Sequence, residues 1–299
     1  MVAVAPRLTA ANAWWSAVRP ATLAASVAPV LAGTAIAVHE GGARLSAGLL
    51  ALLVGVAMQL GVNFANDYSD FVRGADNPRR IGPLRAASSG VVKSEHVRFA
   101  AMAAFGAAAA AGLVLSLITN PGLIAVGVAC LLAGWLYTGG PRPYGYLGLG
   151  EVFVFLFFGL VATVGTAYVE TLRPTSLAVL MGCAMGCLAT AILVLNNLRD
   201  IDTDLEAGKR TLATRIGRAR TRGLLLALVV AAFGIALVAV IAGLAGVTVM
   251  LVLFAIPIAA APVQIAFTTR SGPPLVRALR RMAMAELAYA LLFALGLLL

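Results

Sequence analysis

The sequence predicts an all-α, polytopic membrane protein with nine transmembrane helices in one bundle around a central cavity. Of its 299 residues, 61% are hydrophobic and only 11% are charged, whereas a soluble domain has about 45–50% apolar and about 25% charged residues. A helix needs roughly 20 apolar residues to cross a bilayer, so the apolar residues suffice for about nine spans. This composition excludes a soluble globular enzyme, and the low charge excludes a disordered chain.

The nine spans follow one another along the whole chain. Each is an apolar segment bounded by glycine, proline or charged residues, which are the usual signals of a turn. No soluble segment separates them, so residues 1–299 are predicted to form a single membrane-embedded domain. We place the spans at residues 20–38, 46–66, 97–118, 122–138, 151–169, 176–198, 223–243, 246–268 and 282–299.

The basic residues predict the orientation of the spans. With the N-terminus in the cytoplasm, 20 of the 22 Lys and Arg residues fall in inner segments, and only Arg44 and Arg173 are outside. Cytoplasmic loops of membrane proteins carry such an excess of positive charge. We therefore expect a multi-pass protein of the cell (inner) membrane with its functional loops in the cytoplasm. The basic run from Arg215 to Arg222 is expected to meet anionic lipid headgroups, not nucleic acid.

A stripe of polar residues ends the second predicted span. Gln59, Asn63, Asn66, Asp67 and Asp70 stand at offsets of 0, 4, 7, 8 and 11 residues, which share one face of a helix. Polar side chains at membrane depth are costly and normally face the bundle interior or a water-filled cavity. The stripe therefore marks a candidate functional site at the cytoplasmic end of this span.

A second stripe ends the sixth predicted span. Asn196, Asp200 and Asp204 are spaced by four residues, and Asn197 lies beside them on the same helical face. Both spans run from the outside inward, so both stripes are expected to meet at the cytoplasmic face.

Paired carboxylates on two facing helices are suited to divalent cations. Mg²⁺ prefers oxygen ligands and usually takes one or two carboxylates together with substrate phosphates, and flanking Arg and Lys side chains can neutralise further phosphate charge. Carboxylates at a helix C-terminus also oppose the helix dipole by about 0.3–1 kcal/mol each, and a bound cation offsets this cost. The two stripes thus predict a site for a metal-bound diphosphate.

Other interpretations of the stripes stay open from the residues alone. A single polar stripe can be structural, or part of a proton path, and acidic loops can be plain solvated surface. An ion-coupled transporter is a further alternative. Transporters often contain inverted repeats with the binding site at the midplane, whereas these stripes end spans of the same direction at one face.

The motifs resemble those of a known family. Asn66-Asp-Tyr-Ser-Asp70 and Asp200-x-x-x-Asp204, each ending a span, resemble the two Asp-rich motifs of the UbiA superfamily of intramembrane prenyltransferases. Further segments resemble its branch acting on 1,4-dihydroxy-2-naphthoate, namely Gly82-Pro-Leu-Arg85, Tyr137-Thr-Gly-Gly140, Pro143-Tyr-Gly-Tyr-Leu-Gly-Leu-Gly-Glu151 and Gly208-Lys-Arg-Thr-Leu-Ala213. The chain has Gly74 where the general pattern has a third Asp, and Asp76 follows two residues later.

The resemblance implies a Mg²⁺-dependent enzyme of menaquinone biosynthesis. Such an enzyme transfers a polyprenyl group from polyprenyl diphosphate to 1,4-dihydroxy-2-naphthoate, with loss of CO₂ and diphosphate, and yields demethylmenaquinol. The alternative with the same fold is a UbiA-type prenyltransferase with another acceptor, such as 4-hydroxybenzoate. The metal ligands that the resemblance implies are Asp67, Asp70, Asp76, Asp200 and Asp204.

The remaining candidate residues receive roles from the same resemblance. Lys209 and Arg19 are expected to contact phosphate, and the ring of Tyr137 is expected to face the allylic cation. The expected substrate-binding amides are Asn63, Asn66, Asn196 and Asn197. Arg79 and Arg85 lie on the long connection 73–93, which we expect to close over the diphosphate, exclude water and help to bind the naphthoate carboxylate.

Overall fold

The computed structural model describes residues 9–74 and 85–299, and these residues contain helices and connections without a strand. The predicted site residues Asp76 and Arg79 lie outside the described residues. In chain order the helices are α1 (Ala10–Val18), α2 (Pro20–His39), α3 (Leu45–Val72), α4 (Ser94–Ile118), α5 (Leu123–Leu136), η1 (Tyr144–Leu147), α6 (Gly150–Val154), η2 (Phe155–Val161), α7 (Ala162–Thr171), α8 (Ser176–Glu206), α9 (Leu212–Ile241), η3 (Val247–Ala255), α10 (Ile256–Thr268) and α11 (Pro273–Leu298).

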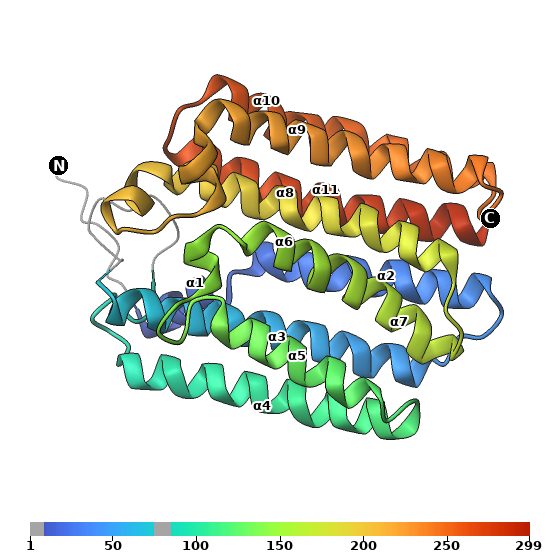
Figure 1. The fold of residues 1–299 in the computed structure, drawn as a ribbon, viewed down its shortest axis with the longest axis horizontal. Helices are drawn as coiled ribbons and strands as arrows, with labels where there is room; N and C mark the ends of the chain where they lie inside the picture. Colours follow the sequence, from blue (N-terminus) through green and yellow to red (C-terminus); the bar gives the residue numbers. More distant parts are fainter. Residues whose placement is uncertain (1–8, 75–84) are drawn as a thin grey trace.

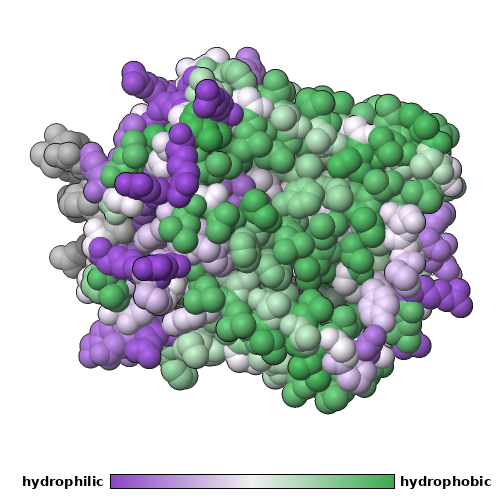
Figure 2. Space-filling model, in the orientation of Figure 1, coloured by the Kyte–Doolittle hydropathy of each residue, from purple (hydrophilic) through white to green (hydrophobic). Residues whose placement is uncertain are grey.

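The helices form one elongated bundle of roughly parallel and antiparallel rods (Figure 1). Within the described residues, eight helical segments are long and apolar enough to cross a membrane, and the shorter apolar helix α5 occupies the fourth predicted span. The predicted all-α membrane architecture is therefore confirmed. Apolar side chains cover the flank of the bundle, and hydrophilic residues gather at its two ends (Figure 2).

Several helices extend beyond the predicted spans. The second and sixth spans were expected to end near residues 66 and 198, but α3 continues to Val72 and α8 to Glu206. Hydropathy detects only the apolar part of a helix, whereas the hydrogen-bonded backbone continues into the polar region. The Asp residues of both stripes consequently lie on the last turns of rigid helices and not on loops.

Helix α8 forms the centre of the core. It packs against α9, α11 and η2, and large side chains along its length are completely buried, among them Met181, Met185, Leu188 and Leu195. Because α8 is enclosed by its neighbours, its polar C-terminal turns are held in a defined orientation. The other polar helix end, that of α3, is held by α4 and α2.

Candidate functional site

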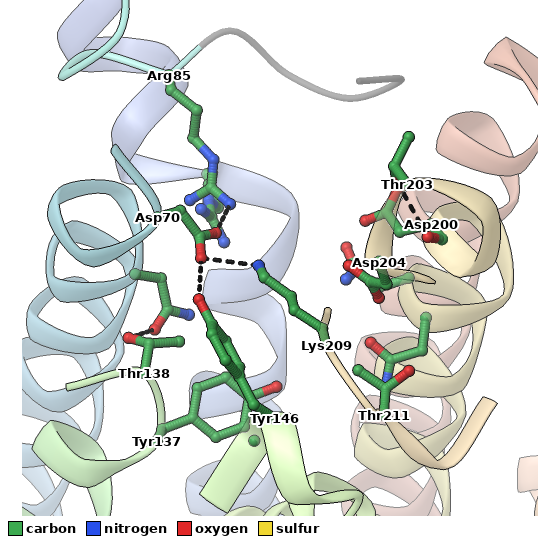
Figure 3. Close-up of a pocket in the computed structure, with 15 residues that line it drawn as sticks. Asp70, Arg85, Tyr137, Thr138, Tyr146, Asp200, Thr203, Asp204, Lys209 and Thr211 are labelled. Atoms are coloured by element: carbon green, nitrogen blue, oxygen red, sulfur yellow. Dashed lines mark hydrogen bonds and ion pairs between the residues drawn. The ribbon is translucent and has the colours of Figure 1, made fainter. Parts of the chain in front are cut away.

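A polar pocket opens at the end of the bundle where α3 and α8 finish (Figure 3). It encloses about 670 Å³ of space, part of it open to solvent. The α5–α6 connection lies at the same end of the bundle (Figure 1), and its residues Thr138, Gly145 and Tyr146 line the pocket. The described residues that line the pocket are Arg19, Asn66, Asp70, Arg85, Tyr137, Thr138, Gly145, Tyr146, Asn196, Asn197, Asp200, Thr203, Asp204, Lys209 and Thr211.

Most of the predicted site residues that the structure describes meet in this pocket. The structure does not bring Asn63 and Asp67 to the lining. Five further lining residues had no role predicted from the sequence. They are Thr138, Gly145, Tyr146, Thr203 and Thr211. The signal for the first three was available, because the Gly- and Pro-rich loop after the fourth predicted span ends at the same face as the two stripes.

Asp70 is the centre of a network of charged and polar groups. Its carboxylate accepts hydrogen bonds from Arg85 Nη2 at 2.6 Å, from the Tyr146 hydroxyl at 2.6 Å and from Lys209 Nζ at 2.8 Å (Figure 3). The Asp70 side chain is only 6% exposed, so these ion pairs are poorly screened by water. Two cations against one carboxylate leave an excess positive charge on this wall of the pocket.

The ring of Tyr146 lies near two cationic side chains, those of Lys209 and Arg73. Its ring lies 4.6 Å from Lys209 Nζ and 5.7 Å from the Arg73 guanidinium carbon, within the range of cation–π attraction. Burial and the neighbouring Asp70 carboxylate raise the pKa of Tyr146 above its ordinary value. The hydroxyl therefore stays protonated and donates to Asp70 throughout the neutral range.

The opposite wall carries Asp200 and Asp204 of α8 (Figure 3). The buried guanidinium of Arg199 donates to both oxygens of Asp200, at 2.7 Å and 2.5 Å, and also to Asn196 Oδ1 at 2.9 Å. The Asp204 carboxylate, in contrast, accepts no hydrogen bond from the residues that the structure describes. It is therefore the pocket carboxylate most accessible to an added cation.

Tyr137 forms an aromatic wall together with its neighbours. Its ring packs edge-on against Tyr144 at 5.5 Å, and Tyr144 stacks on Phe153 at 4.1 Å. Gly145 permits this arrangement, since a Cβ atom there would lie 2.7 Å from the Tyr137 carbonyl oxygen and 3.1 Å from its ring. The loop sequence thus presents an electron-rich ring to the pocket.

Asn63 does not line the pocket and binds the backbone next to Arg19 instead. Its carboxamide donates to Val18 O at 2.9 Å and to Thr22 Oγ1 at 3.1 Å. Arg19, which separates α1 from α2, has a left-handed backbone with a φ of 51°, a conformation that is unfavourable for residues other than glycine. Asn63 therefore supports the junction that carries Arg19, and its predicted contact with substrate gains no support from this position.

Two other asparagines tie the pocket walls to neighbouring elements. Asn66 Oδ1 accepts a hydrogen bond from Thr138 at 2.7 Å, which joins α3 to the α5–α6 connection. Asn197 Nδ2 donates to Glu151 Oε1 at 2.9 Å, which joins α8 to α6. Both asparagines also line the pocket.

Comparison with known proteins identifies the family. The model of the UbiA prenyltransferase family matches residues 26–298. The chain belongs to the UbiA prenyltransferase family. It is 44% identical to the 1,4-dihydroxy-2-naphthoate octaprenyltransferase of Mycobacterium leprae, over 93% of each chain. It is 34% identical to the enzyme of the same name from Haemophilus influenzae, over 95% of each chain.

Solved structures of UbiA homologs share the fold. The apo structure of a UbiA homolog from Aeropyrum pernix K1 superposes with a TM-score of 0.67 at 16% identity, over 96% of this chain and 98% of that chain. A UbiA homolog from Archaeoglobus fulgidus bound to DMAPP and Mg²⁺ gives a TM-score of 0.62 at 15% identity, over 94% and 99% of the two chains.

The donor set of the pocket suits a hard cation such as Mg²⁺. Carboxylate, amide and hydroxyl oxygens face the space from both walls, and among the described residues no thiol or imidazole lines it. No three acidic, His or Cys side chains in the described residues gather closely enough to form a metal cage. Mg²⁺ does not need one, because it usually keeps several waters and binds one or two carboxylates plus substrate phosphates. The pocket of this UbiA-family chain therefore fits a magnesium ion that arrives with a diphosphate.

Proposed function

We propose that this chain transfers a polyprenyl group from polyprenyl diphosphate to 1,4-dihydroxy-2-naphthoate, with loss of CO₂ and diphosphate, and so yields demethylmenaquinol. The observation that carries the proposal is a pocket in which Asp70 faces Asp200 and Asp204, with Lys209 between them and with Arg19 and Arg85 also in the lining (Figure 3). The names of the curated relatives support the same acceptor.

The diphosphate binds between the two acidic walls. Asp70, Asp200 and Asp204 are the proposed magnesium ligands, and a structural neighbour that was crystallised with DMAPP and Mg²⁺ supports this choice of metal. When bound, Mg²⁺ supplies positive charge that stabilises the departing diphosphate. Lys209 and Arg19 contact the phosphate oxygens, and their charges neutralise the remaining negative charge.

The acceptor reacts next to the aromatic wall. Cleavage of the C–O bond leaves an allylic cation, which the ring of Tyr137 stabilises electrostatically. The ring carbon that bears the carboxylate forms the new C–C bond, and the electron pair of the broken bond to CO₂ returns to the ring. The isoprenoid tail lies among the apolar helices, because the long chain is as hydrophobic as the membrane itself.

In this proposal the protein spans the cell (inner) membrane, and the pocket end of the bundle faces the cytoplasm. The distribution of Arg and Lys supports that orientation. The basic segment from Arg215 to Arg222 lies near the start of α9 at this end of the bundle and binds anionic lipid headgroups.

A reconstituted assay tests the proposal. Purified protein in lipid receives 1,4-dihydroxy-2-naphthoate, a polyprenyl diphosphate and Mg²⁺, and the products are analysed by mass spectrometry. Asp204→Asn removes the pocket carboxylate that accepts no hydrogen bond from the described residues, and Asp202→Asn is the matched control. Asp202 lies two residues away, is 70% exposed and pairs with Arg218 outside the pocket.

Demethylmenaquinol from the wild type and Asp202→Asn, but not from Asp204→Asn, supports the proposal. Diphosphate release with no naphthoate product would show that the donor is cleaved but that naphthoate is not the acceptor, and the assay would be repeated with another acceptor, such as 4-hydroxybenzoate. If neither appears with folded protein, the proposed reaction is wrong and ion-coupled transport becomes the alternative to test.

A further inference from the structure

Asp67 belongs to the first acidic motif but does not face the pocket. Its neighbours Asn66 and Asp70 line the pocket, whereas Asp67 is absent from the lining and completely buried. Consecutive residues on a helix point about 100° apart, and here Asn66 faces Thr138 at the pocket whereas Asp67 faces the backbone of Ala86 and Ala87. Asn66 and Asp70 of the motif therefore face the pocket, whereas Asp67 faces another part of the protein.

The carboxylate of Asp67 binds the backbone of the segment that follows Arg85. Asp67 Oδ2 accepts a hydrogen bond from the Ala86 amide at 2.9 Å, and Asp67 Oδ1 accepts one from the Ala87 amide at 3.2 Å. Ala86 and Ala87 are themselves buried. Hydrogen bonds from amides to an ionised carboxylate are among the strong ones in proteins, so Asp67 holds this segment firmly against α3.

The anchored segment determines where Arg85 lies. Arg85 immediately precedes the two anchored amides, and its Nη2 reaches Asp70 at 2.6 Å. Asp67 and Asp70 lie about one turn apart on α3. The Asp67 carboxylate binds the backbone at Ala86 and Ala87, and the Asp70 carboxylate binds the side chain of Arg85 in the same segment. A cation in the pocket meets Asp70 but not Asp67, because Asp67 lies outside the lining and its two carboxylate oxygens face the buried amides of Ala86 and Ala87.

We propose that Asp67 is a positioning residue, which anchors the backbone at Ala86–Ala87 and thereby places Arg85 beside Asp70, and that it is not a metal ligand. This inference rests on the proposed function, in which Arg85 and Asp70 belong to the diphosphate and acceptor site. It replaces the sequence-based expectation that Asp67 binds Mg²⁺ directly.

The matched pair Asp67→Asn and Asp70→Asn tests the assignment, since both remove one carboxylate charge from the same helix. The first readout is Mn²⁺ binding in the presence of inorganic diphosphate, measured by electron paramagnetic resonance. The second is tryptic cleavage after Arg85, identified by mass spectrometry of the intact, reconstituted protein. Neither readout requires turnover, so both remain informative if the proposed reaction is wrong.

We expect Asp67→Asn to keep the Mn²⁺ affinity within about twofold and to increase cleavage after Arg85 by about tenfold, with a raised KM for the prenyl diphosphate. Asp70→Asn should weaken Mn²⁺ binding by about 10- to 100-fold, as is typical when a metal site is disturbed. Equal loss of Mn²⁺ affinity in both variants, with cleavage unchanged, would overturn the proposal. Asp67→Glu, which retains a carboxylate for the amides, should restore protection if Asp67→Asn proves unstable.

Discussion

At the residue scale, the hydrogen-bond donors around Asp70 determine the net charge of this side of the pocket. Three side chains from separate segments converge on this carboxylate, and two of them are cationic. The surplus positive charge attracts a diphosphate, whereas the carboxylates on the facing helix attract the cation that accompanies it. Tyr146 is the only uncharged donor of the three, so it can be tested without altering this balance.

We predict that Tyr146→Phe lowers kcat/KM for the prenyl diphosphate by about 10- to 100-fold, because a hydrogen bond to a charged group contributes about 1.5–3 kcal/mol. The ring is retained, so the cation–π contact with Lys209 stays in place. Steady-state kinetics with the reconstituted protein provide the measurement.

Tyr168→Phe is the control for this prediction. The Tyr168 hydroxyl accepts a hydrogen bond from Asn120 at 2.7 Å on α7, away from the pocket. This variant should lose one tyrosine hydrogen bond, here with a neutral amide, but keep its activity. Equal activity losses in the two variants would mean that Tyr146 acts through stability alone.

At the element scale, the close approach of η2 to α8 fixes the position of the second acidic helix. A Cβ atom on Gly159 would lie 2.3 Å from the Cα atom of Gly186, so the two backbones are in direct contact. Small residues allow such close packing between membrane helices. The wider π-type turns of Phe155–Val161 occur at this crossing, and π-bulges are frequent at functional sites.

We predict that Gly159→Ala destabilises the protein by about 1–3 kcal/mol, because the added methyl group forces the two backbones apart. Gly165→Ala is the matched control, since a Cβ atom at Gly165 meets nothing within 4 Å. Thermal unfolding in detergent compares the two variants. Identical melting temperatures would show that η2 and α8 do not pack this closely.

At the scale of the whole molecule, the two ends of the bundle differ in their hydrophilic surface. The end that carries the pocket also carries most of the hydrophilic surface in the view of Figure 2. The apolar flank between the ends suits a bilayer, and the asymmetry supports a cytoplasmic pocket.

We predict that a cysteine at the pocket end reacts with a membrane-impermeant maleimide only in inside-out vesicles. Glu206→Cys marks the end of α8, and Pro174→Cys marks the opposite connection; both positions are exposed. The native cysteines Cys130, Cys183 and Cys187 are first replaced by alanine. Pro174→Cys should react only in right-side-out vesicles, and the reverse pattern would contradict the proposed orientation.

Much of the fold and part of the site follow from local sequence patterns. The spans follow from apolar length, since this pattern reflects the cost of moving polar groups into hydrocarbon, whereas the orientation that the basic residues indicate stays a prediction. The helical spacing also predicted that Asp200 and Asp204 share a face, and both line the pocket. These properties depend on one helix and the membrane, not on a partner helix.

By itself, the sequence determined the membrane architecture and the two acidic stripes, together with the family that their motifs resemble. Only the tertiary structure decided that Asp67 turns toward Ala86, that Asn63 supports Arg19, and that Tyr146 joins Asp70. The partners of Asp70 lie 15, 76 and 139 residues away in the chain. Helical periodicity gives the angle between side chains on one helix, but which of them faces a pocket depends on how that helix is rotated against its neighbours.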